Sequence, residues 1–147
     1  MSSGGVTIRP ARASDFEDIV ALWSAAGLDA KHQGRDSRES FRFQLTRFST
    51  TYLVAHDEDR LIGVVLGTHD WRKGWINRLA VHPVRRRAGV ARQLIEACER
   101  AFRDLGIEIF AALVERHNTV SATVFQRTGY KDDIPVHYFH KRLGPEV

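Results

Sequence analysis

The chain has 147 residues, 43% of them hydrophobic and 27% charged, and its formal net charge is +4. This composition is ordinary for a globular protein and argues against a membrane protein, because no apolar run approaches the roughly 18 residues of a membrane span. The single cysteine, Cys98, excludes an internal disulfide and has the helical spacing of a buried structural thiol. With no secretory signal, we expect one cytoplasmic domain that spans residues 1–147.

Strands and helices alternate along the chain in the order β-α-α-β-β-β-α-β-α-β. Strands are predicted where apolar residues alternate or run together between turn signals, at residues 6–10, 51–56, 60–69, 75–81, 108–114 and 136–143. Helices are predicted where apolar residues recur at helical spacing, from Ser14 to Gly27, Ser37 to Phe48, Val90 to Gly106, and Asn118 or Thr119 to Thr128. We expect residues 75–81 to form the central strand and residues 108–114 to be covered on both faces. The order predicts one mixed α/β domain.

A strand, a turn at Pro83 and a helix N-terminus follow one another between residues 76 and 92. Three consecutive arginines, residues 85–87, lie in the connecting loop, and Gly89 and Ala91 begin the helix. A helix N-terminus offers unpaired N–H groups and the positive end of the helix dipole, and small residues let a phosphate approach them. This segment therefore predicts a phosphate site. It lacks the lysine-bearing GxxxxGK[ST] loop, so the nucleotide need not be a hydrolysed triphosphate.

The net charge of +4 is compatible with nucleic acid as well as with a small anionic cofactor. The arginines are concentrated in one loop, and no long basic tail or aromatic–basic platform accompanies them. This distribution favours the cofactor and argues against nucleic acid.

Two motifs give the chain a specific resemblance to a known family. Arg86–Ala91 (RRAGVA) follows the segment Leu79-Ala80-Val81-His82-Pro83, and about thirty residues further on Asn118 precedes a helix that ends in Phe125–Tyr130 (FQRTGY). In this order the chain resembles the GNAT superfamily of acyl-CoA-dependent N-acyltransferases over nearly its full length. The resemblance implies a mixed central sheet with helices on both faces, and acetyl-CoA as the acyl donor without a metal.

The resemblance also implies which residues bind the donor. The backbone of Leu79 and Val81 would pair with the pantetheine amides, and the N–H groups from Arg87 to Arg92 would bind the pyrophosphate. Asn118 would bind the pantetheine arm or act only as a helix cap, and Phe125 would pack against the cofactor. The cofactor-binding residues predicted in this way are Leu79, Ala80, Val81, Arg86, Arg87, Ala88, Gly89, Val90, Ala91, Arg92, Asn118 and Phe125.

Amide formation requires a neutral amine, a polarised thioester carbonyl and a proton for the leaving thiolate. The resemblance assigns the polarisation to the backbone N–H of Val81. Many relatives use a tyrosine of the last helix as the acid, but Phe125 stands at that position and has no hydroxyl. Tyr130 reads as a core residue and Tyr138 is a weak substitute, so water could supply the proton.

The sequence does not assign the general base to one residue either. Relatives that use a glutamate carry it where Trp75 or Leu113 stands in this chain. Asn77 is expected to share a strand face with Trp75 and Leu79, and Glu115 reads better as a solvated residue. The catalytic candidates near the expected cleft, between strands that splay apart, are His69, Asp70 and Asn77.

A weak base favours an acceptor amine of low pKa. A lysine amine with a pKa near 10.4 is neutral at pH 7 in about one molecule in 2,500, which costs roughly 4–5 kcal/mol, whereas an α-amine near 7.8 costs about 1 kcal/mol. The acceptor is expected beside residues 28–38, where a carboxylate or phosphate would suit the basic side chains unless this is merely a solvated loop. The basic residues of this loop are Lys31, His32, Arg35 and Arg38, and the apolar walls nearby are Trp71 and Trp75.

Three functions remain open from the sequence. The leading hypothesis is an acetyl-CoA-dependent N-acetyltransferase that acts on a small molecule or a peptide N-terminus. The alternatives are an inactive acyl-CoA-binding sensor of the same fold and a nucleic-acid-binding module. His137 and His140 fall on opposite strand faces and predict no metal pair, whereas the terminal strands could support a homodimer.

Overall fold

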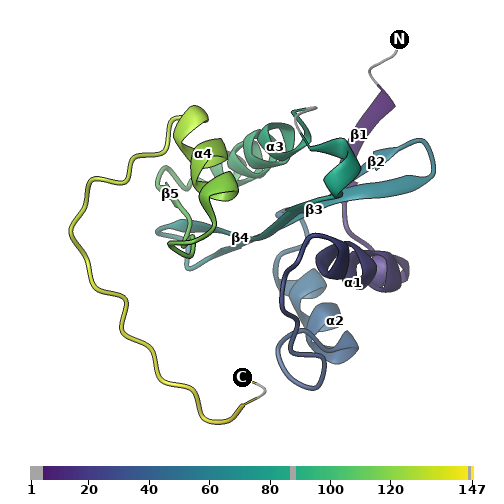
Figure 1. The fold of residues 1–147 in the computed structure, drawn as a ribbon, viewed down its shortest axis with the longest axis horizontal. Coiled ribbons are helices and arrows are strands. Elements are labelled where there is room, and N and C mark those ends of the chain that lie inside the picture. Colours follow the sequence, from purple (N-terminus) through teal and green to yellow (C-terminus); the bar gives the residue numbers. More distant parts are fainter. Residues whose placement is uncertain (1–4, 87–88, 146) are drawn as a thin grey trace.

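A five-stranded sheet with helices on both faces forms the body of the computed structural model, which describes residues 5–86, 89–145 and 147 (Figure 1). The strands, in their order across the sheet, are β1 (Val6–Pro10), β2 (Tyr52–Asp57), β3 (Arg60–His69), β4 (Gly74–Val81) and β5 (Phe110–Ala111). β1 to β4 are antiparallel, and β5 runs parallel to β4. The predicted mixed sheet is confirmed. The centre is β3 rather than the expected β4, because each strand pairs with its neighbours in sequence.

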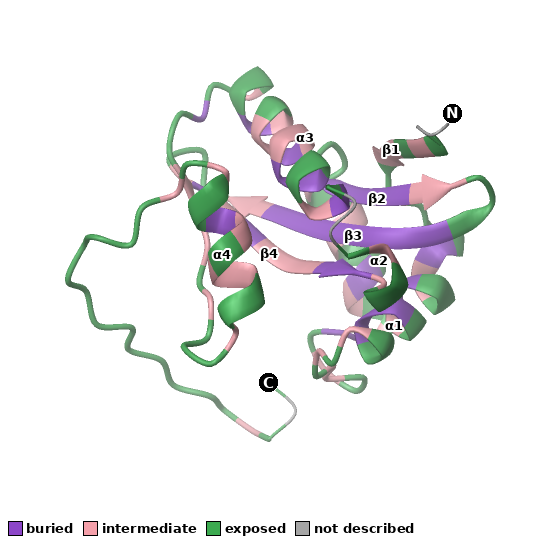
Figure 2. Cartoon of the chain, turned by 45° about the horizontal axis from the view of Figure 1, so that its top comes forward, coloured by how far each residue is buried: buried purple, intermediate pink, exposed green. Residues whose placement is uncertain are grey.

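Two helices cover each face of the sheet. α1 (Phe16–Ala25) and α2 (Arg38–Arg47) lie on one face, and α3 (Val90–Asp104) and α4 (Thr119–Arg127) lie on the other (Figure 1). β2 and β3 are consequently buried along most of their length (Figure 2). The Ser37 hydroxyl accepts a hydrogen bond from the Ser40 N–H at 3.1 Å and caps α2 as predicted. Among the described residues, no helix is both long and apolar enough to cross a membrane.

The core under α3 contains the single cysteine. Its Sγ donates to the Thr51 carbonyl at 3.9 Å, and burial raises the pKa of the Cys98 thiol to about 12. Gly67 provides the space, because a Cβ there would lie 2.5 Å from this sulfur. The predicted structural role of the cysteine is confirmed. The buried face of α3 consists of Val90, Leu94, Ile95, Cys98 and Phe102.

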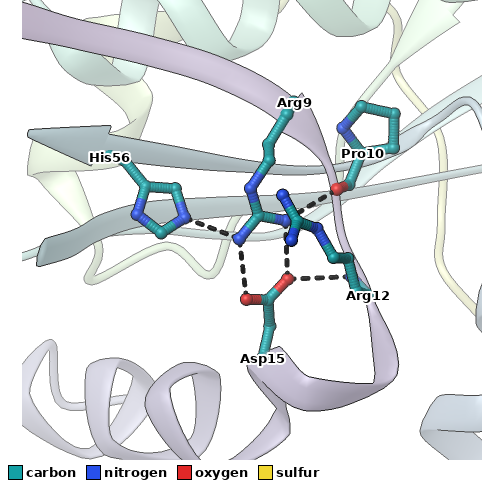
Figure 3. Close-up of polar contacts among 5 residues, drawn as sticks. All are labelled: Arg9, Pro10, Arg12, Asp15 and His56. Carbon is teal, nitrogen blue, oxygen red and sulfur yellow. Dashed lines mark hydrogen bonds and ion pairs between the residues drawn. The ribbon is translucent and has the colours of Figure 1, made fainter. Parts of the chain in front are cut away.

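A hydrogen-bonded ion pair joins β1 to the start of α1 (Figure 3). The Arg9 guanidinium donates to both Asp15 carboxylate oxygens at 2.8 Å and lies 2.7 Å from His56 Nε2. The same carboxylate accepts a hydrogen bond from the Arg12 N–H at 2.8 Å. The side chain that makes hydrogen bonds at the start of the first helical region is therefore that of Asp15. The expected helix cap at Ser14 is therefore wrong. A short 3-10 turn, Ala13–Asp15, precedes α1 instead.

Two predicted strands differ from the structure. Only Phe110 and Ala111 of the expected strand 108–114 pair with β4. The expected coverage on both faces is also wrong, because Ile109 is 56% exposed and Leu113 58%. Residues 136–143 form no strand, and the C-terminal segment runs in a wide arc away from the sheet (Figure 1). Its exposed large apolar residues are Ile134, Val136, Tyr138, Phe139, Leu143 and Val147.

Candidate functional site

β4 and β5 diverge soon after they meet. Gly74 pairs with Phe110 and Trp75 with Ala111, and β4 then continues alone on this side to Val81. In the described part of the chain, no strand pairs with this edge beyond Trp75. The predicted splaying of the two strands is present, and it leaves the backbone of Leu79 to Val81 at an open sheet edge that an extended ligand could pair with.

A β-bulge lies in β4 beyond the residues that pair with β5. Between the pairs Val64–Ala80 and Leu66–Asn77, β3 has one residue and β4 has two, Arg78 and Leu79. Arg78 adopts a left-handed φ of 51°. The bulge turns both Asn77 and Arg78 towards α1 and α2, and Leu79 packs against the core under α3. The expectation that Leu79 shares a face with Trp75 and Asn77 is therefore wrong, because strict alternation fails at a bulge.

The N-terminus of α3 follows the open edge. Gly89 begins it with φ 80°, and the Gln93 N–H donates to the Gly89 carbonyl at 3.0 Å. The N–H groups of residues 90–92 precede that first bond and have no partner within the helix, as a phosphate site requires. Arg86 is exposed and has no ion pair with a described residue. Arg87 and Ala88, which were also predicted to contact the cofactor, lie outside the described residues.

Arg85 and Arg92, the first and last arginines between β4 and the first turn of α3, already form ion pairs with acidic residues. Arg85 pairs with Asp57 at the end of β2, and Arg92 Nε lies 3.3 Å from Glu96 Oε2. The Arg85 ion pair fixes the loop against the sheet. Arg92 is exposed and could contact an anion at the helix N-terminus only by leaving or sharing Glu96.

The second motif places Asn118 and Phe125 on α4. The Asn118 side-chain oxygen accepts the Ser121 N–H at 3.1 Å, and its amide nitrogen has no partner among the described residues. Asn118 is therefore a helix cap with a free donor. Phe125 is 7% exposed and packs against Tyr130, whose hydroxyl donates to Glu99 at 2.6 Å. Burial and Glu99 raise the Tyr130 pKa, which makes its hydroxyl a poor proton donor to a thiolate.

The three catalytic candidates form no hydrogen bond with one another in the described part of the chain. The His69 ring lies at the end of β3 beside Trp71, Phe48 and Phe102, with ring centres 4.8, 5.5 and 6.3 Å away. Asn77 lies on the face of the sheet covered by α1 and α2 and donates to Thr68 Oγ1 at 2.9 Å. No hydrogen bond between described residues joins the side chains of His69 and Asn77.

Asp70 belongs to the turn between β3 and β4. Its carboxylate accepts the N–H groups of Lys73 and Arg72, both at 2.9 Å, and these two hydrogen bonds lower its pKa. A carboxylate stabilised in its charged form is a weak base. Asp70 also borders a surface hollow of about 270 Å³, whose other lining residues are Arg72, Lys73, Trp75 and Ile109.

Sequence reasoning missed Arg78, since an arginine within a strand ordinarily reads as solvent-facing. The bulge instead places its guanidinium 4.3 Å from the Trp23 ring centre. The loop before α2 lies beside it, with Asp36 Oδ2 at 3.8 Å from Arg78 Nη2. No local pattern marks a left-handed residue other than glycine, so only the structure reveals this position.

Comparisons with known proteins agree with this arrangement. The sequence model of the acetyltransferase (GNAT) family matches residues 16–130. An acetyltransferase of Photorhabdus laumondii is 28% identical over 125 residues, which are 85% of this chain and 86% of that protein.

The solved structures that are similar to this chain over most of both chains include two acetyltransferases. The aminoglycoside antibiotic 6′-N-acetyltransferase of Acinetobacter baumannii has a TM-score of 0.78 at 22% identity, covering 95% of this chain and 100% of that chain. The PaiA N-acetyltransferase of Thermoplasma acidophilum, solved in complex with coenzyme A, has a TM-score of 0.76 at 21% identity and covers 89% and 91%. At these identities the structural likeness shows the fold.

Proposed function

Because this chain belongs to the acetyltransferase (GNAT) family, we propose that it transfers an acetyl group from acetyl-CoA to a primary amine of a small molecule or a peptide N-terminus. The observation that carries the proposal is the open β4 edge followed directly by the α3 N-terminus at Gly89. The extended pantetheine arm of the donor would lie along the strand edge, and the pyrophosphate at the end of that arm would lie at the helix N-terminus. We propose that residues 1–147 act as one transferase domain in the cytoplasm.

The described residues fit the donor in chemistry as well as in order. The backbone of Leu79, Ala80 and Val81 would bind the pantetheine amides, and the amide nitrogen of Asn118 would donate to the same arm. The N–H groups of Val90, Ala91 and Arg92, beside Gly89 and Arg86, would bind the pyrophosphate. The Phe125 ring would pack against the bound cofactor and form a side wall of its binding site. Bound in this way, acetyl-CoA supplies an activated acyl carbon with a thiolate leaving group.

We propose direct attack by the amine in a ternary complex. The only cysteine is buried with a raised pKa, so no thiol is available to form an acyl-enzyme. The amine nitrogen bonds to the carbonyl carbon, the carbon–sulfur bond breaks, and a proton passes from the amine to solvent as the thiolate leaves. The Val81 N–H would polarise the carbonyl. His69, Asp70 and Asn77 remain predictions for proton transfer or for positioning the amine.

The first test is acetyl-CoA-dependent release of CoA thiol across amino acids, polyamines, aminoglycosides and short peptides. A matched pair sharpens it: one peptide with a free α-amine and an acetylated lysine, and the same peptide with a blocked α-amine and a free lysine. At pH 7 we expect kcat/KM to favour the α-amine by about 300-fold, because a larger fraction of it is neutral. The ratio should fall as the pH rises towards 10. A preference for lysine at pH 7 would contradict the assignment.

An inactive acyl-CoA sensor is the second candidate, favoured by Phe125 at the acid position. Such a protein would be stabilised against heat by acetyl-CoA and would release no thiol with any amine of the panel. Thiol release that requires both acetyl-CoA and an amine excludes it.

We also propose a homodimer in which the C-terminal segment of each copy pairs with the β5 edge of the other copy. Ile134, Val136 and Tyr138 lie at alternate positions of the C-terminal segment and are 65–75% exposed. The β5 edge, with exposed Ile109 and Leu113, lies open in the same protein. A segment and an edge of this kind are complementary, because in the described chain no strand pairs with the C-terminal segment or with the outer edge of β5.

The dimer predicts a specific mass change. Light scattering after gel filtration should give twice the mass of one chain for the wild type and the mass of one chain for Val136→Asp, because a charge on the apolar strand face opposes burial. His137→Asp, one residue along and on the other face, should remain a dimer. A wild type with the mass of one chain at micromolar concentration would contradict the proposal.

A further inference from the structure

The bulge of β4 places a positive charge in an aromatic environment beneath the loop before α2. Arg78 lies against Trp23, which is 2% exposed, and near Tyr52, which is fully buried. Neither neighbour carries a formal negative charge. Burial lowers the pKa of Arg78, yet an arginine stays protonated in proteins, so the site holds a cation that has lost much of its hydration.

The polar atoms at this position have no hydrogen-bond partners among the described residues. Nε and Nη2 of Arg78 are sealed from solvent, and so are Trp23 Nε1 and Tyr52 Oη. The fourth buried polar group, Asp36, lies 3.8 Å from Arg78 Nη2, which is too far for a hydrogen bond. Its Oδ2 atom instead accepts the Lys31 N–H at 2.7 Å. The Arg78 side chain therefore has one acid at ion-pair distance and no hydrogen bond to a described residue, so its charge is only partly compensated within the protein.

Arg78 remains accessible from one side. Its side chain is 22% exposed, and Nη1 is neither sealed nor hydrogen-bonded to a described residue. It directly precedes Leu79 at the open edge of β4, and on the same face Asn77 precedes it. A ligand at Nη1 would therefore lie beside the strand where we place the thioester, on the side of the loop formed by residues 28–37.

We propose that Arg78 binds a carboxylate of the acceptor substrate, so that the acceptor carries both the reacting amine and a carboxylate group. This proposal rests on the proposed acetyl transfer. A planar guanidinium matches a carboxylate and gives charge-assisted hydrogen bonds. Arg78 and Arg35 face Asp29 and Asp36 in this region, so one added negative charge is tolerated better than the two of a phosphate. The acceptor class is amino-acid-like or peptide-like, with a free carboxylate.

The test compares dipeptides that differ only at the carboxyl end, one with a free acid and one with an amide. For the wild type we expect kcat/KM for the acid to exceed that for the amide by about 10- to 100-fold, the range of one charge-assisted hydrogen bond. Arg78→Gln should remove the preference by lowering activity on the acid alone, and should leave the KM for acetyl-CoA unchanged. Arg78→Lys should keep part of the preference. Arg100→Gln, on the exposed side of α3, is the charge-matched control and should behave as the wild type.

Binding without turnover separates this proposal from the proposed function. The N-acetylated dipeptides cannot react, and calorimetry in the presence of CoA should show the acid binding more tightly than the amide, with the difference lost in Arg78→Gln. This preference without thiol release from any amine would support the carboxylate site and contradict the transferase. Thiol release with equal use of acid and amide by the wild type would overturn the carboxylate site, even if Arg78→Gln failed to fold. Equal losses on acid and amide in Arg78→Gln would show a structural role and overturn it as well.

Discussion

We expect Gly89→Val to reduce acetyl-CoA affinity by about 100-fold or more while the protein stays folded. Gly89 has φ 80°, which costs an L-residue about 1–2 kcal/mol, and a Cβ there would meet nothing within 4 Å. The described protein atoms therefore leave room for a Cβ at this position. The bound pyrophosphate would leave none, because the Cβ would project where the phosphate approaches the N–H groups of residues 90–92.

Gly106 offers a matched control at the other end of α3. It has φ 84° and equally open space around its Cβ, so Gly106→Val carries the same backbone strain at a position remote from the proposed phosphate site. Both variants should lose a similar amount of unfolding free energy, and only Gly89→Val should lose binding in calorimetry. Equal affinities in the two variants would refute the pyrophosphate assignment.

The second large effect concerns stability. Arg9→Met should lower the unfolding free energy at pH 7 by about 2–3 kcal/mol, between the ranges for exposed and fully buried ion pairs. The variant leaves the Asp15 carboxylate, whose side chain is 8% exposed, without its charged partner. Arg92→Met, which breaks the exposed pair with Glu96, should change the value by less than about 0.5 kcal/mol.

The pH dependence of this loss gives a stricter test. Burial raises the pKa of Asp15, but the hydrogen bonds from Arg9 and the Arg12 N–H and the charge of Arg9 together lower it. The wild type therefore has this stabilisation above about pH 4 and loses it as the pH falls towards the lower folded pKa. Without Arg9, protonation of Asp15 is less unfavourable, so the wild type and the variant should converge in acid.

His56 adds a second pH range in which the wild type loses stability as the pH falls. Burial first and Arg9 second lower its pKa, so the wild type begins to lose stability as the pH falls below about 6.5, where the unfolded chain takes up the proton. Removing Arg9 weakens this effect. The difference in unfolding free energy, measured by urea denaturation, should shrink between pH 7 and pH 4, and a constant difference would contradict the assigned network.

The sequence predicted best what depends on local periodicity and capping. α3 is recognisable because Leu94, Cys98 and Phe102 repeat at helical spacing, and its end is marked by Gly106. Ser37 and Asn118 cap their helices as expected. The passage from β4 through a turn to Gly89 was also predictable, because strand, turn and helix follow one another within a single short segment, whereas the open edge of β4 was implied only by the resemblance to the GNAT family.

Features that depend on distant residues could not be predicted. The left-handed Arg78 is compatible with β4 only because β3 supplies one residue opposite two, and no property of Arg78 itself indicates this. The apolar run 108–114 looked like a buried strand, but β4 and β5 diverge after Ala111 and leave Leu113 exposed. Alternation alone likewise could not tell whether residues 136–143 have a partner within their own chain.

The buried Cys98 thiol determines how this protein can be assayed. Disulfide reagents react with thiolates, and in the folded protein this sulfur is both inaccessible and held protonated. Colour that develops in a continuous thiol-reagent assay therefore comes from released CoA, with no background from the enzyme. The same property makes the cysteine a reporter of unfolding, because each chain exposes one reactive sulfur only when its core opens.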